Sequence, residues 1–338
     1  MLRSLDVASL PLIVLADVQE VVVGSHFAEV GRVHRCSFCA IIASIDQPYP
    51  VDIVPLIPEF LGRRRLGFTY PLRVMEELGI DRPTFGFVIS GVGFQGDEGG
   101  RLEDLFNPYS TIFDQWKGPA AAARGAGLAE LDEASGRWRI TPKGRDLFTR
   151  VRREADAYLA TLEPIPSAEI VQLAALLARA LAAVEASGVP FDHMPRNARL
   201  RGNGQIPMVA LENALFGLWH ARDDSHMSSW RDAGFDGPSF DVLTRLWRKE
   251  ATTESDLVAK LPTQRPEDVA AGLARLRAKG LVEPEALEVT EKGAKLRQHI
   301  EDETDRKFFA PWPADVGKQA PWMIDRLRSV NAALAPRT

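Results

Sequence analysis

Cysteine is almost absent from this chain of 338 residues, which contains only Cys36 and Cys39. A disulfide framework is therefore excluded, and the low usage fits a reducing compartment. His26 and His34 lie near the two cysteines, so four potential zinc ligands fall within fourteen residues. Structural zinc sites usually hold two ligand pairs apart around a turn or helix, whereas His34 lies only two residues before Cys36. We therefore expect no metal site and interpret both cysteines as small apolar residues.

An excess of basic charge and a long uninterrupted apolar run are also missing. The formal net charge is -5, so indiscriminate binding to nucleic acid is not expected and any DNA contact must be local. The longest apolar stretch near the start, residues 10–23, is interrupted by Asp17, Gln19 and Glu20, which are costly in a bilayer. The same acidic interruption spoils the pattern of a signal peptide. We expect a cytoplasmic protein with no membrane partner.

The common signatures of enzymes are missing as well. The sequence has no Gly-x-x-x-x-Gly-Lys-Ser/Thr loop, no Gly-x-Ser-x-Gly elbow and no His-Glu-x-x-His helix. The glycine-rich stretch 91–100 lacks the strand, the lysine and the helix that a phosphate cradle requires. Familiar catalysis is therefore not indicated. Whether the chain catalyses an unfamiliar reaction, and with which cofactor, stays open.

The organisation of the chain points to several domains, as its length suggests. Short β-type runs at 13–15 and 21–23 and scattered prolines mark the N-terminal part, where we expect strands rather than helices. Helical patterns begin near Pro71. We divide the chain into an N-terminal extension of uncertain structure (1–65), a first domain (66–163), a helical connector with a basic loop that carries Arg196, Arg199 and Arg201 (164–205), a second domain (206–314) and a C-terminal helix (315–338).

The two domains repeat one succession of elements. In the first, an Ala-rich helix ends at Gly127, two apolar runs surround a Ser135-Gly136 turn, and a long helix follows, which predicts a helix, a β-hairpin and a helix. In the second, a helix over 266–279 ends at Gly280 and is followed by a short hairpin and another long helix. Thr141-Pro142-Lys143-Gly144 corresponds to Thr290-Glu291-Lys292-Gly293. A period of about 150 residues indicates domain duplication.

The stretch from Gly280 to Gly293 resembles the wing and final-helix entry of MarR-type winged-helix regulators, over about 90 residues in each copy. Residues 220–247 and 300–312, with Gly-Phe-Asp-Gly and Glu-Thr-Asp…Pro-Trp, also look like an actinobacterial family of winged-helix proteins of unassigned biochemistry. The resemblance implies a mainly α fold with short β-hairpin wings, as tandem winged-helix domains joined by a helical connector. It implies DNA binding and transcription regulation for the MarR type and brings no activity from the second family.

The two copies depart from the DNA-binding pattern to different degrees. The second wing tip, Pro284-Glu285-Ala286, is short and acidic, so it repels a phosphate backbone. The first copy is better equipped with cations, although its alanine-rich helix offers bases little beyond contact with thymine methyls. The predicted DNA-binding residues are Lys117, Arg124, Arg137, Arg139, Lys143 and Arg145. The alternative is that these charges form only a solvated face.

A second candidate site lies on the long helix predicted from 207 to 233. Helical spacing places Trp219, Arg222, Asp223, His226 and Trp230 on or beside one otherwise apolar face, where charges must be paired. One interpretation is a ligand or cofactor pocket with His226 as hydrogen-bond donor, general base or metal ligand. The other is an internal cluster that fixes helix packing. One helix supplies too few ligands for a closed metal site.

Two hypotheses follow from the sequence. The first is a transcriptional regulator whose duplicated units act as a pseudo-dimer within one chain, with DNA as partner. The second is a small-molecule-binding protein or enzyme on a repurposed winged-helix scaffold. Either protein could be a monomer or a homodimer. The charge around the two wings is the observation that distinguishes these hypotheses most directly.

Overall fold

The computed structural model describes residues 49–105, 108–188 and 201–336. The predicted strands at 13–15 and 21–23, the Cys36 and Cys39 pair, and Arg196 and Arg199 lie outside the described residues. Within the described part the chain is mainly helical, and its one sheet is a two-stranded antiparallel hairpin. This is the predicted combination of helices with a short β-hairpin.

The N-terminal half contains many short helices before its hairpin and one long helix after it. In chain order its elements are η4 (Val51–Ile53), α2 (Leu56–Arg63), α3 (Tyr70–Leu78), α4 (Arg82–Gly86), η5 (Phe87–Gly91), η6 (Val92–Phe94), η7 (Gly96–Glu98), α5 (Leu102–Leu105), η8 (Asp114–Trp116), α6 (Lys117–Gly125), β1 (Ala129–Asp132), β2 (Arg137–Ile140) and α7 (Pro142–Leu159).

The expectation of strands before residue 66 fails where the structure describes this region, because residues 51–63 form η4 and α2. The prolines that suggested extended chain stand at helix starts instead. Pro50 and Pro55 precede the first residues of η4 and α2, and Pro58 lies in the first turn of α2. A first-turn residue has no intrahelical partner for its N–H, so proline costs little there.

In the described residues of the C-terminal half, the regular elements are helices and one short ribbon. Its elements are α8 (Ser167–Glu185), α10 (Pro207–Asp232), α11 (Gly237–Trp247), α12 (Glu254–Ala259), α13 (Pro266–Ala278), α14 (Glu291–Phe309), α15 (Ala314–Lys318) and α16 (Ala320–Ala333). By length and composition alone α8 could cross a membrane, with a mean hydropathy of 1.6. Its Ile170, Leu173 and Leu177 are buried in a core shared with α10, as in a core helix of a globular protein.

Buried and more exposed side chains alternate along β2 of the first hairpin. Ala129 pairs with Ile140, and Asp132 pairs with Arg137 at the turn. Trp138 and Ile140 are buried, while Arg137 and Arg139 lie on the outer face. Trp138 also exchanges both backbone hydrogen bonds with Gly100, which adds a third segment to the ribbon.

The second ribbon is much shorter than the first. Only Val282 and Val289 form a bridge, supported by the Glu283 N–H, which donates to the Glu288 carbonyl at 2.8 Å. Its tip, residues 284–286, has no room for further pairs. The predicted hairpin is thus reduced here to one bridge.

The joint between helix, ribbon and long helix is built identically in the two halves. Gly127 and Gly280 end α6 and α13 with φ of 70° and 67°. Thr141 and Thr290 donate to the carbonyls of these glycines at 2.7 and 2.8 Å. The same hydroxyls accept the backbone N–H of the glycine three residues later, at 3.1 Å in each half, and so cap α7 and α14.

A lysine completes this joint in both halves. The ammonium of Lys143 donates to the Ala126 carbonyl and that of Lys292 to the Lys279 carbonyl, each at 2.8 Å. These carbonyls lie at the ends of α6 and α13, where a cation is favourable. The sequence correspondence between the two halves is therefore also a correspondence of contacts.

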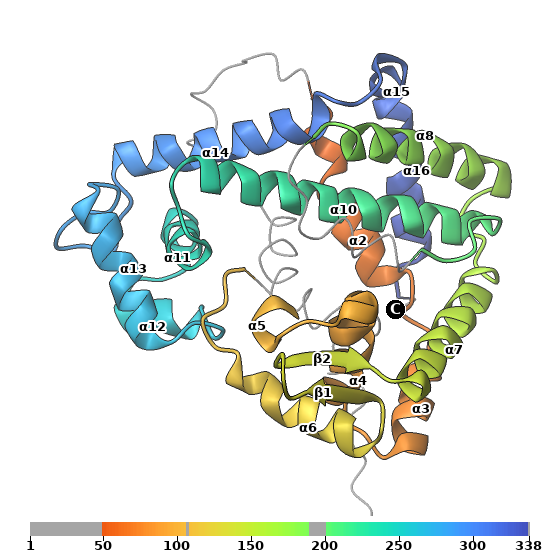
Figure 1. Cartoon of the computed structure of the whole chain (residues 1–338). Coiled ribbons are helices and arrows are strands. Elements are labelled where there is room, and N and C mark those ends of the chain that lie inside the picture. Colours follow the sequence, from red (N-terminus) through yellow and green to blue (C-terminus); the bar gives the residue numbers. More distant parts are fainter. Residues whose placement is uncertain (1–48, 106–107, 189–200, 337–338) are drawn as a thin grey trace, which may run out of the picture.

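The buried residues of the described chain form three cores, and Figure 1 shows the helices that contribute to them. The first is formed by α3, α4, α6, the hairpin and α7, and another by α11, α12, α13 and the start of α14. The central core joins α2, α8, α10 and α16, with α10 and α14 packed along each other. The N-terminal and C-terminal parts meet here, since the buried Asn331 side chain donates to the Leu56 carbonyl at 3.0 Å.

Candidate functional site

The six basic residues predicted to bind DNA lie on the first hairpin and on the two helices that flank it. Lys117 and Arg124 are on α6, Arg137 and Arg139 are on β2, and Lys143 and Arg145 are in the first turn of α7. All are exposed or half-buried. Their common location follows from the joint described above, because it fixes the end of α6, the hairpin and the start of α7 together.

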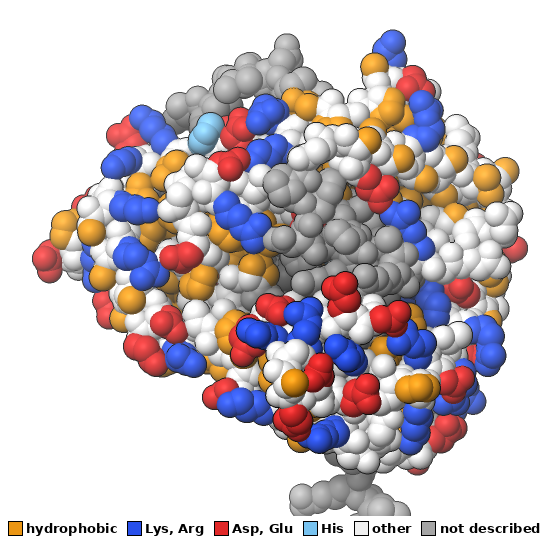
Figure 2. All heavy atoms as spheres, in the orientation of Figure 1, with side chains coloured by type: hydrophobic (Ala, Val, Ile, Leu, Met, Phe, Trp, Pro, Cys, Tyr) orange, Lys and Arg blue, Asp and Glu red, His pale blue; other side chains and the backbone are white. Residues whose placement is uncertain are grey.

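Each of these cations has a partner within the first half. Four pair with carboxylates, in the pairs Lys117–Asp114 (2.7 Å), Arg124–Glu133 (3.0 Å), Arg139–Asp132 (3.3 Å) and Arg145–Asp97 (2.9 Å). Arg137 donates to the carbonyls of Glu98 and Gly99 at 3.0 and 2.7 Å. Acidic and basic side chains are accordingly interspersed over the face of the molecule in Figure 2, without a continuous positive strip.

These surface pairs do not prevent contact with phosphate. Such pairs between solvent-exposed groups contribute little to stability and are screened by salt. A phosphate oxygen can therefore replace a carboxylate at Arg124 or Arg145, whose side chains are 54% and 53% exposed. The neighbouring carboxylates would oppose the approach of a phosphate backbone. The surface is therefore suited to a few local contacts.

The helices that precede the two ribbons expose several alanines to solvent. In α6 the exposed residues include Ala121 and Ala122, and in α13 they include Ala270, Ala271, Ala274 and Ala278. The cations of α13 contact the neighbouring helices α11 and α12. Arg275 donates to the Ser239 hydroxyl at 2.7 Å, and Arg277 pairs with Glu254 at 3.4 Å. Direct hydrogen bonding to base edges from either helix is correspondingly weak.

The charged residues predicted on α10 contact carboxylates and a hydroxyl group of α14. Arg222 pairs with Asp305 at 3.1 Å and with Glu301 at 3.5 Å. The His226 Nδ1 lies 3.1 Å from the Thr304 hydroxyl, and the His226 ring stands edge-on to Phe240, 5.2 Å between centroids. Asp223 is buried beside them. These residues therefore lie within the packing between two helices.

A second arginine completes this buried cluster. Arg297 of α14 is 1% exposed, lies over the rings of Phe240 and Trp247 at 4.8 and 5.0 Å, and pairs with Glu301 at 2.5 Å. Burial alone would raise the pKa of Glu301, but Arg297, His226 and Arg222 together hold that pKa well below its usual range. Burial raises the pKa of Asp305 above its usual value.

The structure separates the two tryptophans of this predicted site. Trp219 packs in the central core, whereas Trp230 packs in the core that contains α11, α12 and α13, where its indole N–H donates to the Tyr109 hydroxyl at 3.2 Å. The two tryptophans at the ends of the predicted set therefore pack in different cores. In the described part of the chain, no group of three or more His, Cys, Asp or Glu side chains is arranged to hold a metal ion.

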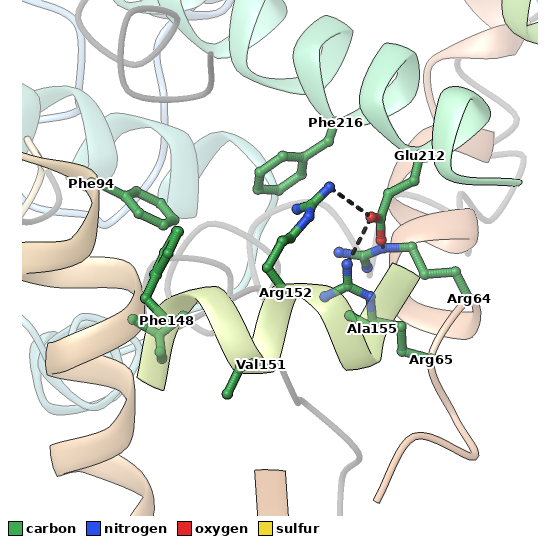
Figure 3. A pocket seen from close by; sticks show the side chains of 10 residues that line it. Arg64, Arg65, Phe94, Phe148, Val151, Arg152, Ala155, Glu212 and Phe216 are labelled. Carbon is green, nitrogen blue, oxygen red and sulfur yellow. Dashed lines mark hydrogen bonds and ion pairs between the residues drawn. The ribbon is translucent and has the colours of Figure 1, made fainter. Parts of the chain in front are cut away.

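Sequence reasoning missed a different buried cluster, which joins the two halves. Glu212 of α10 is 3% exposed. Its carboxylate accepts hydrogen bonds from Arg64 Nε at 2.5 Å and from Arg65 Nη2 at 2.7 Å (Figure 3). Arg152 of α7 approaches the same carboxylate at 3.8 Å. Two signals were present, the Arg63-Arg64-Arg65 run and a lone glutamate among the apolar residues of α10. Neither signal indicates its partner, because the residues lie far apart in sequence.

The comparisons with known proteins concern mainly the second half. The model of a helix-turn-helix family matches residues 163–338, which is more than half of the chain and includes α8 to α16. The matched part contains the three mutually packed helices α11, α12 and α13 and the ribbon and long helix that follow them. Among curated proteins and among solved structures no match was found.

Proposed function

Because the chain belongs to a helix-turn-helix family, we propose that it is a DNA-binding transcriptional regulator in which two winged-helix units within one chain replace a homodimer. The first unit is residues 66–163 and the second is 206–314, joined by the connector 164–205. The observation that carries this proposal is the repeated joint, with its positive-φ glycine, capping threonine and lysine in the same contacts in both halves.

The arrangement of the cores supports a rigid pairing of the two units. A homodimer of helix-turn-helix proteins needs a fixed separation between its two DNA-contacting units. Here α7 leaves the first unit and α14 leaves the second, and both helices contact α10. The central core thus takes the place of a dimer interface.

The proposed DNA contacts are asymmetric. Phosphate groups would be contacted by the six cations of the first unit, Lys117, Arg124, Arg137, Arg139, Lys143 and Arg145. The tip of the second ribbon at Glu285 is acidic and would not contact the DNA backbone. The alanine faces of α6 and α13 leave the bases to be read by apolar contact or by DNA shape. Affinity for DNA at physiological salt is therefore expected to be modest.

We do not extend this proposal to a ligand or enzyme site at Arg222, Asp223 and His226. Arg222 and His226 are engaged by Asp305, Glu301 and Thr304 of α14. Such an arrangement favours the interpretation as an internal cluster that fixes the packing of α10 on α14.

The test is selection of duplexes from a random pool, followed by fluorescence anisotropy of the enriched duplex between about 50 and 200 mM salt. Arg124→Ala and Arg145→Ala should each lower the salt slope of log K by about 1. The matched control is Arg179→Ala on α8, which breaks a comparable exposed pair with Asp315 at 2.8 Å and should leave the slope unchanged. Failure to enrich any duplex, or equal slopes for all four proteins, would refute the proposal.

A further inference from the structure

Residues 108–113, which lie between α5 and α6, pack against the C-terminal half of the chain. The Tyr109 ring is buried in the core that contains α11, α12 and α13, and its hydroxyl accepts the indole N–H of Trp230 at 3.2 Å. The backbone at Pro108 lies directly against Gly237, the first residue of α11, because a Cβ added to this glycine would lie 2.2 Å from the Pro108 carbonyl oxygen. This segment therefore connects the two halves of the chain.

The same segment is bonded to the turn between α12 and α13. The Thr263 carbonyl accepts the backbone N–H of Thr111 at 2.9 Å and that of Ile112 at 3.1 Å. It also accepts the Ser110 hydroxyl at 3.0 Å. In return, the backbone N–H of Arg265 donates to the Thr111 hydroxyl at 2.9 Å. We call these four hydrogen bonds the junction, and they join residues shortly before α6 to residues immediately before α13.

The junction limits the distance between the starts of α6 and α13. The bond from the Arg265 N–H to the Thr111 hydroxyl brings the Cα atoms of these two residues within about 7 Å. From Thr111 to Phe113 the chain spans at most about 7 Å, and the 3-10 turn from Phe113 to Lys117 adds about 9 Å. The Cα atoms of Lys117 and Arg265 therefore lie within about 23 Å of each other. Dimeric helix-turn-helix proteins bind half-sites that are about 34–36 Å apart, one helical turn of DNA.

An exposed cation lies on each side of the junction. Lys117 is the first residue of α6 and Arg265 is the last residue before α13, and both side chains are exposed. The hydrogen bond from Lys117 lowers the pKa of Asp114, and the charge of Arg265 lowers it further, so both cations lie near one carboxylate. Arg265 is not among the six cations that the sequence predicts to contact DNA. The structure brings it close to one of them.

We propose that α6 and α13 contact DNA within one helical turn, at a single compact site, with Lys117 and Arg265 on phosphates near its centre. This inference rests on the proposed function and narrows its substrate to one class of DNA site. Helix-turn-helix proteins contact base edges with the first residues of the recognition helix. Two half-sites a full turn apart would therefore require helix starts that are farther apart than the junction allows. Because the two units differ in sequence, the compact site should also lack two-fold symmetry.

Substitution of every base pair in the selected duplex measures the extent of the site. Fluorescence anisotropy with the intact chain should show a loss of affinity of about 5-fold or more at each base pair that is read. All such positions should form one block, or groups whose centres lie less than one helical turn apart, about 10 base pairs. Groups with centres one turn or more apart would overturn the inference and leave the proposed function intact. A pool that yields no enriched duplex refutes the proposed function, and the inference with it.

Arg265 is tested through its charge. Arg265→Ala should lower the salt slope of log K by about 1, as Lys117→Ala should. Both side chains are exposed, so these variants should fold. The matched control is Arg328→Ala, at an exposed arginine of α16, which should leave the slope unchanged. If Arg265→Ala has the slope of the control, Arg265 does not contact phosphate and the inference is overturned.

Gly237→Ala tests whether the junction holds the two helices in place for binding. The added Cβ would lie 2.2 Å from the Pro108 carbonyl oxygen, so residues 108–113 should move away from α11. Affinity for the selected duplex should then fall by about 5-fold or more, because the two helices are no longer held at a fixed separation. Gly62→Ala on α2, where an added Cβ meets nothing within 4 Å, is the control. Wild-type affinity in a folded Gly237→Ala protein would overturn the inference. If this variant does not fold, the base-pair substitutions and Arg265→Ala decide.

Discussion

Glu212 is a carboxylate held in its ionised form inside the protein. Burial alone would raise its pKa, but Arg65, Arg64 and Arg152 lower it to about 2, against about 4.5 in the unfolded chain. A depressed pKa means that the stabilisation is complete above pH 4.5 and is lost as the pH falls through 2. The cluster is therefore a source of acid sensitivity.

We predict that Glu212→Gln lowers the free energy of unfolding at pH 7 by about 3–5 kcal/mol, because it leaves buried arginines without their carboxylate. Urea denaturation at a series of pH values measures this loss. The difference from wild type should shrink between pH 5 and pH 2, where the wild-type carboxylate becomes protonated. Glu291→Gln, at a fully exposed pair with Lys295, is the control and should change little. A pH-independent difference would contradict the assigned ionisation.

His226 tests whether the cluster between α10 and α14 is structural. His226→Ala removes the contact with the Thr304 hydroxyl and the edge contact with Phe240, and it removes a favourable neighbour of Glu301. We expect the free energy of unfolding to fall by about 1–3 kcal/mol. The DNA affinity of the folded variant should stay as in wild type. Unchanged stability combined with an altered DNA affinity would show that His226 belongs to a binding site.

At the scale of elements, local chemistry determined what could be predicted. The turn at Ser135, the helix stop at Gly280 and the capping threonines at 141 and 290 act through neighbouring backbone groups, and the structure has each of them. The helical segment 51–63 was missed because prolines at helix starts resemble those of extended chain. The second ribbon was overestimated because its short tip leaves space for only one bridge.

The repeated joint makes a prediction about two glycines. A Cβ added at Gly144 would lie 2.1 Å from the Leu128 carbonyl oxygen, and one at Gly293 would lie 2.2 Å from that of Leu281. Gly144→Ala and Gly293→Ala should each destabilise the protein by about 2 kcal/mol or more, since backbone must move. Gly118→Ala in α6, where an added Cβ meets nothing within 4 Å, should be neutral or stabilising. Thermal denaturation of the three variants provides the comparison, and tolerance of alanine at either joint glycine would show that the joints are not equivalent.

At the scale of the whole molecule, the sequence could indicate a repeated succession of elements but not how the parts of the chain pack together. Arg64 and Arg65 lie 148 and 147 residues before Glu212, and Asn331 lies 275 residues after the carbonyl of Leu56 that it contacts. Polar contacts of this range leave no periodic pattern along the chain. The same reason explains why the predicted set from Trp219 to Trp230 divides between two cores, because one helix passes through both.

The central claim is that one chain supplies both units of a DNA-binding pair. The most direct measurement is the molar mass of the complex between the protein and its selected duplex, obtained by sedimentation. The account predicts one chain of 37.3 kDa per duplex, with no change as protein concentration rises above saturation. Two chains bound cooperatively to one duplex would show that the units do not act as an intrachain pair.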